Sequence, residues 1–254
     1  MKKIHFLAVF AAVVSLISGC ASVEEQIFPA DITLKELEKR INKASDPDGV
    51  FANSKSYIMR QEVRTSQFLD EDQVKMVELK FEKPDKLALI TYDENQPASI
   101  FCTDGKDGWI ADCSSRKIVQ LEENGLKRMQ MLTRLSTPGS GGYAAVFSKV
   151  EVNKCINEEG EFYRITCYPE YQKYPIYFYV DSNDFLLRKM NMTVDVDGKT
   201  FDYENRIIDY ETREGVNIPM VTEVKQMGVT QKSKVIFYRL NPQIPESDFQ
   251  PPVF

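Results

Sequence analysis

Histidine is nearly missing from this chain. Of its 254 residues only His5 is a histidine, and it lies in an N-terminal segment with the composition of a secretory signal. Once that segment is removed, no imidazole remains for a Ser-His-Asp or Cys-His catalytic arrangement or for a histidine-containing zinc site. A hydrolase that uses two carboxylates stays open on composition. Because no spacing among the 38 acidic residues marks such a pair, we expect no enzyme, no metal and no cofactor.

Long apolar runs and an excess of positive charge are also lacking. Beyond the N-terminal segment, no hydrophobic run approaches the length of a membrane span. The chain holds 32 Lys and Arg against 38 Asp and Glu, and removing residues 1–19, with two lysines and no acid, changes the net charge from −6 to −8. An acidic protein lacks the basic surface that displaces phosphate counterions, so we expect no nucleic-acid partner. Anionic lipid is disfavoured in the same way, so an anchor must supply any membrane contact.

The first twenty residues suggest such an anchor. Lys2 and Lys3 precede an apolar run, and Ile17-Ser18-Gly19-Cys20 closes it. This pattern is typical of a secretory signal, and the cysteine after small residues resembles the lipobox of bacterial lipoproteins. The resemblance implies cleavage between Gly19 and Cys20 and acylation of Cys20, which binds a bilayer stably when two or more chains are attached. The alternative is an ordinary signal peptide that happens to contain a cysteine.

The anchor sets the expected organisation and location. We expect a signal peptide over 1–19, a lipidated tether over 20–32 and a single domain over 33–254. Ala21 and Ser22 stand where a signal for retention in the inner membrane would often show aspartate, which favours the outer membrane. The protein is therefore expected in the cell envelope, with its body facing the periplasm. The sequence does not indicate an oligomeric state.

Four further cysteines are consistent with export. Cys102 and Cys113 flank a turn-rich segment, Asp104 to Gly108, and Cys155 and Cys167 flank another turn signal. Each pair is expected on facing strands of a hairpin, and CxxC-type metal spacing is missing. We therefore predict two hairpin disulfides formed in an oxidising compartment. The alternative is four buried free thiols.

The hydropathy pattern predicts a mainly β protein. A capping box at Thr33 and Glu36 begins a short amphipathic helix that ends near residue 44, and apolar spacing predicts a second helix over 126–135. Elsewhere apolar residues alternate with period two between regularly spaced turns, which indicates either one large, strongly curved antiparallel sheet or a barrel. The strands are expected at 56–68, 74–81, 87–92, 98–103, 109–113, 117–121, 150–155, 162–168, 176–180, 185–196, 200–210, 219–226 and 231–240.

A glycine-rich segment interrupts the pattern. Gly139-Ser140-Gly141-Gly142 precedes the apolar stretch 143–147. The segment over 136–147 is either a mobile lid or a flexible connection beside a packed helix. It is not a phosphate loop, because no GKS or GKT follows the glycines.

The order of several motifs resembles the outer-membrane lipoprotein-sorting proteins (LolA/LolB-like). These motifs are a strand ending at Lys83-Pro84, an Asp-Gly hairpin ahead of Trp109, and the segments 177–190, 209–219 and 244–249. The resemblance spans roughly residues 33–250. It implies a half-open barrel, a curved antiparallel sheet wrapped around helices, with an apolar cavity between them that takes acyl chains. The same half-barrel occurs in an envelope-stress regulator (RseB-like), so the fold alone does not fix the function.

The implied cavity can be assigned candidate lining residues. Alternation along strand 185–196 places its even-numbered apolar residues on one face, and two residues of an earlier strand do likewise. Methionines suit a site that adapts to flexible chains, although the same residues would also fill a closed core. The candidates are Leu87, Leu89, Leu186, Met190, Met192 and Val194.

The sequence is compatible with three alternative functions. The first is a non-enzymatic, membrane-anchored lipoprotein that binds acyl chains or lipidated proteins in lipoprotein sorting or reception. The second is an envelope sensor that acts through a protein partner, as in the RseB-like proteins. The third, an envelope hydrolase with two carboxylates in a polar cleft, is the least favoured.

Overall fold

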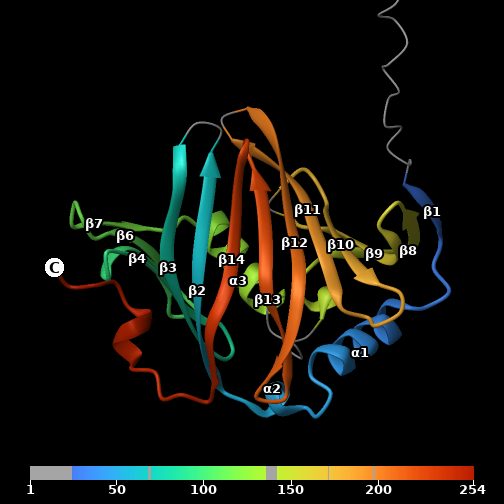
Figure 1. The fold of residues 1–254 in the computed structure, drawn as a ribbon, viewed down its shortest axis with the longest axis horizontal. Coiled ribbons are helices and arrows are strands. Elements are labelled where there is room, and N and C mark those ends of the chain that lie inside the picture. Colours follow the sequence, from blue (N-terminus) through green and yellow to red (C-terminus); the bar gives the residue numbers. More distant parts are fainter. Residues whose placement is uncertain (1–24, 68–69, 136–141, 171, 197) are drawn as a thin grey trace, which may run out of the picture.

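A computed structural model describes residues 25–254 except 68–69, 136–141, 171 and 197. Its main feature is one open antiparallel sheet of fourteen strands, in the order β1-β8-β9-β10-β11-β12-β13-β14-β2-β3-β4-β5-β6-β7. Nearly all neighbours in this order are also neighbours in sequence, because most strands are joined by hairpins. The central strands are long, and both ends of the sheet turn back behind them, so the sheet forms a half-barrel (Figure 1).

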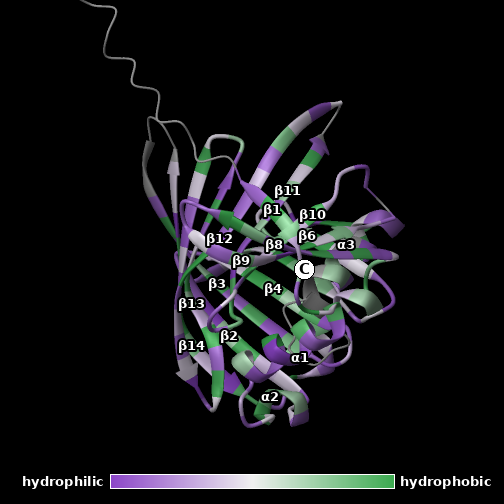
Figure 2. Cartoon of the chain, turned by 90° about the vertical axis from the view of Figure 1, so that its right-hand side faces the viewer, coloured by the Kyte–Doolittle hydropathy of each residue, from purple (hydrophilic) through white to green (hydrophobic). Residues whose placement is uncertain are grey.

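The strands agree closely with the alternating segments of the sequence. Figure 2 shows hydrophilic and hydrophobic residues alternating along the long strands, as expected for a sheet with two different environments. The strand bounds are β1 Gln26–Pro29, β2 Ser56–Gln67, β3 Asp70–Glu82, β4 Lys86–Asp93, β5 Gln96–Thr103, β6 Gly108–Asp112, β7 Lys117–Gln120, β8 Lys149–Asn157, β9 Gly160–Tyr168, β10 Ile176–Asp181, β11 Leu187–Val196, β12 Lys199–Arg213, β13 Val216–Gln226 and β14 Val229–Leu240.

Short helical segments accompany the sheet. The first helix begins after Thr33, whose hydroxyl accepts a hydrogen bond from the Glu36 amide at 3.3 Å, so the N-terminal cap predicted from the sequence is present. The helical bounds are α1 Leu34–Ser45, α2 Val50–Asn53, α3 Glu123–Leu135, η1 Tyr143–Ala145 and η2 Glu246–Phe249. Both helices expected from the sequence are confirmed, and α2 is an addition.

The concave face of the sheet holds two apolar clusters. In one, Leu37 of α1 and Met131 of α3 pack against Phe178 and neighbouring residues of β9–β11. In the other, Phe51 of α2 packs with Tyr57 and with residues of β3, β4, β13 and β14. Helix α3 contributes Met129 to the second cluster and Met131 to the first, so it joins the two.

The convex face is covered at one end by the C-terminal segment. Phe249 of η2 is fully buried against Ala88 and Cys102, with Trp109 and Ile244 packed at the edge of the cluster. Successive residues of a strand point to opposite faces, so this convex cluster lies behind the second concave cluster, which also uses β4.

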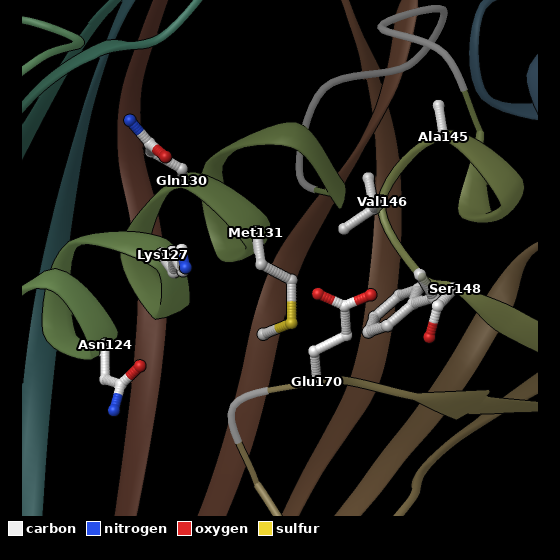
Figure 3. A pocket seen from close by; sticks show the side chains of 9 residues that line it. Asn124, Lys127, Gln130, Met131, Ala145, Val146, Ser148 and Glu170 are labelled. Atoms are coloured by element: carbon white, nitrogen blue, oxygen red, sulfur yellow. The ribbon is translucent and has the colours of Figure 1, made fainter.

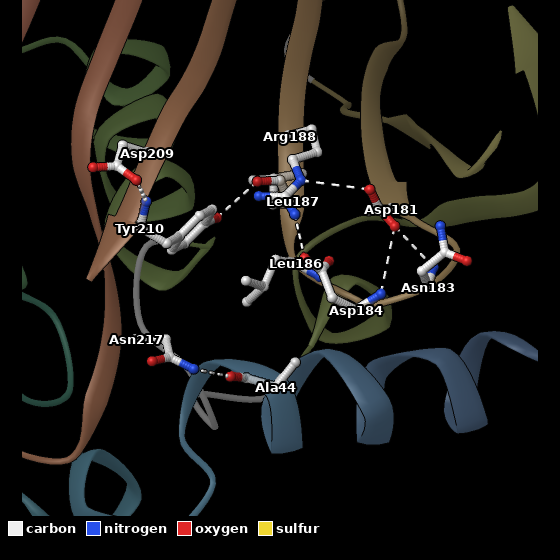
Figure 4. A network of polar contacts seen from close by, with 10 residues as sticks. All are labelled: Ala44, Asp181, Asn183, Asp184, Leu186, Leu187, Arg188, Asp209, Tyr210 and Asn217. Carbon is white, nitrogen blue, oxygen red and sulfur yellow. Dashed lines mark hydrogen bonds and ion pairs between the residues drawn. The ribbon is translucent and has the colours of Figure 1, made fainter. Parts of the chain in front are cut away.

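Polar contacts fix the hairpin between β10 and β11 and the position of α1 (Figure 4). The Tyr210 hydroxyl donates to the Leu187 carbonyl at 2.7 Å, and Arg188 forms ion pairs with Asp181 and Asp184. The Asn217 amide donates to the Ala44 carbonyl at 2.7 Å, which ties the end of α1 to β13. These contacts hold the helix against the sheet that it covers.

The N-terminal part of the chain differs from expectation in one respect. Residues 26–29, assigned to the tether by the sequence, form β1 and pair with β8, with Ile27 opposite Cys155. All four residues of β1 are exposed, so no alternation could mark the strand. The expected signal peptide and Cys20 lie outside the described residues, as do residues 136–141 of the glycine-rich segment.

A buried carboxylate connects the convex side of β2, β3 and the C-terminal segment. Glu78 is 3 % exposed and forms ion pairs with Arg60 at 2.5 Å and Lys80 at 3.2 Å, and Lys80 also reaches Asp248 at 3.0 Å. Burial by itself raises the pKa of Glu78, but the hydrogen bonds from Arg60 and Lys80 outweigh it, so the pKa is lowered. The carboxylate is therefore ionised in the folded protein.

We predict that Glu78→Gln destabilises the fold by about 3 kcal/mol, because it removes the carboxylate that pairs with Arg60 and leaves the partly buried Lys80 with Asp248 alone. Glu62→Gln is the matched control, since Glu62 pairs with Arg64 within β2 at a position more exposed than that of Glu78. It should change the free energy of unfolding by less than about 0.5 kcal/mol. Urea unfolding measures both values, and equal effects would contradict the account.

The lowered pKa also predicts a pH dependence. The contribution of Glu78 is complete above the ordinary glutamate pKa, about 4.3, and is lost as the pH falls through the lowered value of the folded protein. The difference in stability between the unmodified protein and Glu78→Gln should therefore shrink in acid. A difference that stays constant from neutral pH into this range would show that Glu78 acts by packing alone.

Candidate functional site

A row of apolar side chains crosses the concave face at one register. Paired positions on five successive strands, from β3 to the edge strand β7, place these residues side by side. At the inner end the row continues through Met59 on β2 to Tyr238 on β14. The five residues, which we call the apolar row, are Leu79, Leu89, Phe101, Ile110 and Val119.

The row is increasingly exposed toward the sheet edge. Leu79, Leu89 and Phe101 are half-buried, whereas Ile110 and Val119 are 43 % and 50 % exposed. With Met59 and Tyr238 the line crosses seven strands, a distance of roughly 29 Å at about 4.8 Å per strand. Exposed aliphatic residues that share one face are unusual beside a helix-covered core, and they offer apolar area to a ligand.

Helix α3 packs on the concave face beside this row. Gly108 lies two residues from Ile110, and a side chain at Gly108 would meet Leu121 Cδ1 at 2.8 Å and Leu126 Cδ1 at 3.2 Å. The absence of a side chain therefore lets the start of α3 sit directly on β6. The Gln130 amide donates to the Gly105 carbonyl at 3.0 Å and holds the helix there. The outer residues of the row, Ile110 and Val119, remain exposed beside the helix.

A pocket of about 570 Å³ lies at α3, beside the segment that leads into β8 (Figure 3). Its apolar lining comes from Met131, Val146 and Phe147, and its polar residues include Lys127 and Glu170. The volume falls within the range of small-molecule sites. Opposite charges among its lining residues make it suited to an amphiphilic ligand rather than to a bare hydrocarbon chain.

The candidate residues from the sequence divide between the two halves of the sheet. Leu87 and Met190 are buried in the two core clusters, 7 % and 8 % exposed, so they fill packed core. Leu89 belongs to the apolar row. Met192 packs against the first cluster, and Val194 is half-buried on the same strand.

Leu186 does not lie where alternation placed it. It precedes β11, and a register shift between Tyr179 and Val180 places Leu187 opposite Val180. Leu187 accordingly packs against the first cluster. A period-two pattern in the sequence does not reveal such a bulge. One extra residue in the strand moves the side chains of the preceding residues to the opposite face of the sheet.

Several residues of the candidate site were missed from the sequence. Phe101, Ile110 and Val119 lie on strands that were identified correctly, but their common face with Leu89 depends on the pairing register of three hairpins. Tyr238 was missed for the same reason. Its hydroxyl is buried without a hydrogen-bond partner among the described residues, and burial raises its pKa, so it stays protonated as a donor.

The predicted disulfides are not formed: Cys102, Cys113, Cys155 and Cys167 are free thiols in the structure. In the first hairpin Cys102 pairs with Trp109, while the amide of Cys113 donates to the Ala98 carbonyl. The two cysteines are thus four residues out of register, or about 13 Å along the strands. A disulfide needs α-carbons within about 6.8 Å.

The second pair is separated further. Cys155 pairs with Phe162, and Cys167 pairs with Val150, five residues along the hairpin. They also point to opposite faces, since Cys155 packs with Tyr179 on the convex side and Cys167 lies in the first concave cluster. Closeness in sequence predicted the hairpins correctly, but the turn positions set a register that keeps the thiols apart.

Other classes of site receive no support within the described part of the chain. There, no group of three or more His, Cys, Asp and Glu residues is placed to hold a metal ion. No helix within 25–254, apart from the gaps given above, is long and apolar enough to cross a membrane.

Comparison with solved structures identifies the architecture. A LolA superfamily protein from Nitrosomonas europaea superposes with a TM-score of 0.56 at 12 % identity, covering 87 % of this chain and 98 % of that one. A putative outer membrane lipoprotein-sorting protein domain from Vibrio parahaemolyticus gives 0.57 at 13 % identity, with 85 % and 95 % covered. A DUF1329 family protein from Desulfovibrio piger gives 0.58 at 9 % identity, with 85 % and 97 % covered.

The chain has a LolA-like fold. No protein-family model and no curated protein matches the sequence, so the likeness rests on structure. The half-barrel expected from the sequence motifs is thereby confirmed, and the apolar row lies on the face that this half-barrel encloses.

The free thiols lead to a chemical prediction. Burial raises the pKa of Cys102 to about 11; for Cys155, burial together with a hydrogen bond to Glu25 raises it to about 12. Burial also raises the pKa of Cys167. Alkylation of the native protein at pH 8 should therefore modify Cys113, which is partly exposed, well before the other three.

Mass spectrometry of the alkylated peptides measures this order. All four cysteines should react after unfolding without a reductant. A peptide pair linked through Cys102 and Cys113, or through Cys155 and Cys167, would contradict the register.

Proposed function

We propose that this protein binds the acyl chains of lipids or lipidated proteins on the concave face of its sheet. In this proposal it is held at the outer membrane by acylated Cys20 and takes part in lipoprotein sorting or reception, without catalysis. The observation that carries the proposal is the half-open apolar row beside α3, which no segment among the described residues covers fully. The LolA-like fold supports it, because similar folds include a putative lipoprotein-sorting domain.

The chemistry of the row suits a hydrocarbon chain. Each buried methylene contributes about 0.8 kcal/mol, and binding requires no polar partner along the chain. The row runs from the exposed Val119 inward to Tyr238, whose unpaired hydroxyl could donate to an ester or amide oxygen. Exchange would proceed toward the site with the larger apolar contact area. An acyl chain leaves a donor protein, binds the apolar row, and then passes into the bilayer.

Displacement of a fluorescent acyl probe tests the proposal. The protein from Ala21 onward, which contains all of the described strands and helices, would be titrated with the probe and then with an acylated lipopeptide or its unacylated twin. We expect only the acylated form to displace the probe. Failure of the probe to bind would remove the acyl-binding proposal.

A matched pair of variants locates the site. Ile110 and Ile118 are similarly exposed, 43 % and 40 %, on neighbouring strands, but Ile110 faces the concave side and Ile118 faces the convex side. Ile110→Lys should weaken probe binding about tenfold or more, because it removes apolar contact and adds a charge, whereas Ile118→Lys should leave it unchanged. Equal effects of the two substitutions would place the probe elsewhere.

A further inference from the structure

The convex face carries a hollow that the acyl-binding proposal does not use. It measures about 350 Å³ and lies over β2, β13 and β14, on the side opposite α3. Figure 1 looks onto these three strands, with α3 behind them. The residues that line it are Glu62, Arg64, Val221, Lys232, Ser233, Lys234 and Ile236.

A backbone bulge places apolar side chains on this face. In β14 the register with β2 shifts between Val235 and Phe237. Val235 is buried in the second cluster, whereas Ile236 and Phe237 are 52 % and 40 % exposed. Bulges are features that re-aim side chains, often near functional sites.

The charge around the hollow is opposite in sign to that of the chain. Three cations, Arg64, Lys232 and Lys234, line the hollow with one carboxylate, Glu62, in a protein of net charge −6. Glu62 pairs with Arg64, and Glu223 is shared by Lys225 at 3.2 Å and Lys232 at 3.3 Å. Lys234 forms no ion pair with any residue that the structure describes.

The apolar contacts and the charge together define a partner. We propose that this hollow binds an extended, acidic segment of a partner protein that carries at least one large apolar side chain. The apolar side chain would enter beside Val221 and Ile236, and flanking carboxylates would pair with Lys232 and Lys234. A hollow on a convex sheet fits an inserted side chain better than it fits a flat bilayer, so a protein segment is favoured over anionic lipid.

Fluorescence anisotropy with a labelled, glutamate-rich peptide of about twelve residues and a central Phe-Leu pair tests the site. Binding should weaken roughly tenfold in the double variant Lys232→Glu, Lys234→Glu, and should fall with added salt. The matched control is Lys35→Glu, Lys39→Glu, which makes the same change in net charge on the exposed face of α1 and should bind as the unmodified protein does. Acyl-probe binding should be unchanged in both variants, which separates this site from the concave one.

Three outcomes would overturn the proposal. The peptide does not bind the unmodified protein, or it binds both double variants equally weakly, so that net charge alone explains the effect. In the third outcome, the protein binds vesicles that contain phosphatidylglycerol more strongly than it binds the peptide, and it does not bind neutral vesicles. The vesicle binding is lost in the Lys232→Glu, Lys234→Glu variant. That result would assign the hollow to a membrane surface. Ile236→Ser tests the apolar contribution separately and should also weaken peptide binding.

Discussion

The structure depends on how the concave face of one open sheet is kept from water. A fourteen-stranded sheet exposes two faces, and only a few short helical segments are available to cover the inner one. Leu37, Met131 and Phe51, each from a different helix, anchor the two apolar clusters that do so. The curvature of the sheet reduces the area that those segments must cover. Among the described residues they leave the apolar row partly exposed, and this incomplete coverage is the physical basis of the proposed acyl-binding site.

The two faces of the sheet differ in chemistry because successive residues of a strand point to opposite sides. On β2, Met59 continues the line of the apolar row, while Arg60 on the opposite face pairs with the buried Glu78. On β14, Val235 fills the core and Ile236 lines the convex hollow. The overall acidic charge does not reveal the local cluster of cations around this hollow, since its members come from separate strands. Substitutions on one face can therefore test the proposed lipid site without altering the proposed site for a protein segment on the other.

Much of the fold could be predicted from the sequence, because alternation, capping and turns are local signals. The cap at Thr33 and the long strands were identified within a few residues. Pairing register could not be read in the same way: Cys102 and Cys113 lie on the expected hairpin but four positions apart, and a shift at Tyr179 places Leu187 where Leu186 was expected. The candidate site was missed in part for this reason, since Phe101 and Ile110 become neighbours only through the register. Strand β1, fully exposed and four residues long, carries no local signal at all.

The most direct test of the account is to map where a bound acyl chain lies. A lipid with a photoreactive group along its acyl chain would be bound to the protein, irradiated, and located by mass spectrometry of the cross-linked peptides. If the chain binds the apolar row, cross-links are expected on the concave residues of β4 to β7, with Phe101 and Ile110 among them, and an acylated lipopeptide should compete with them. Cross-links confined to the convex face, or unaffected by the competitor, would contradict it.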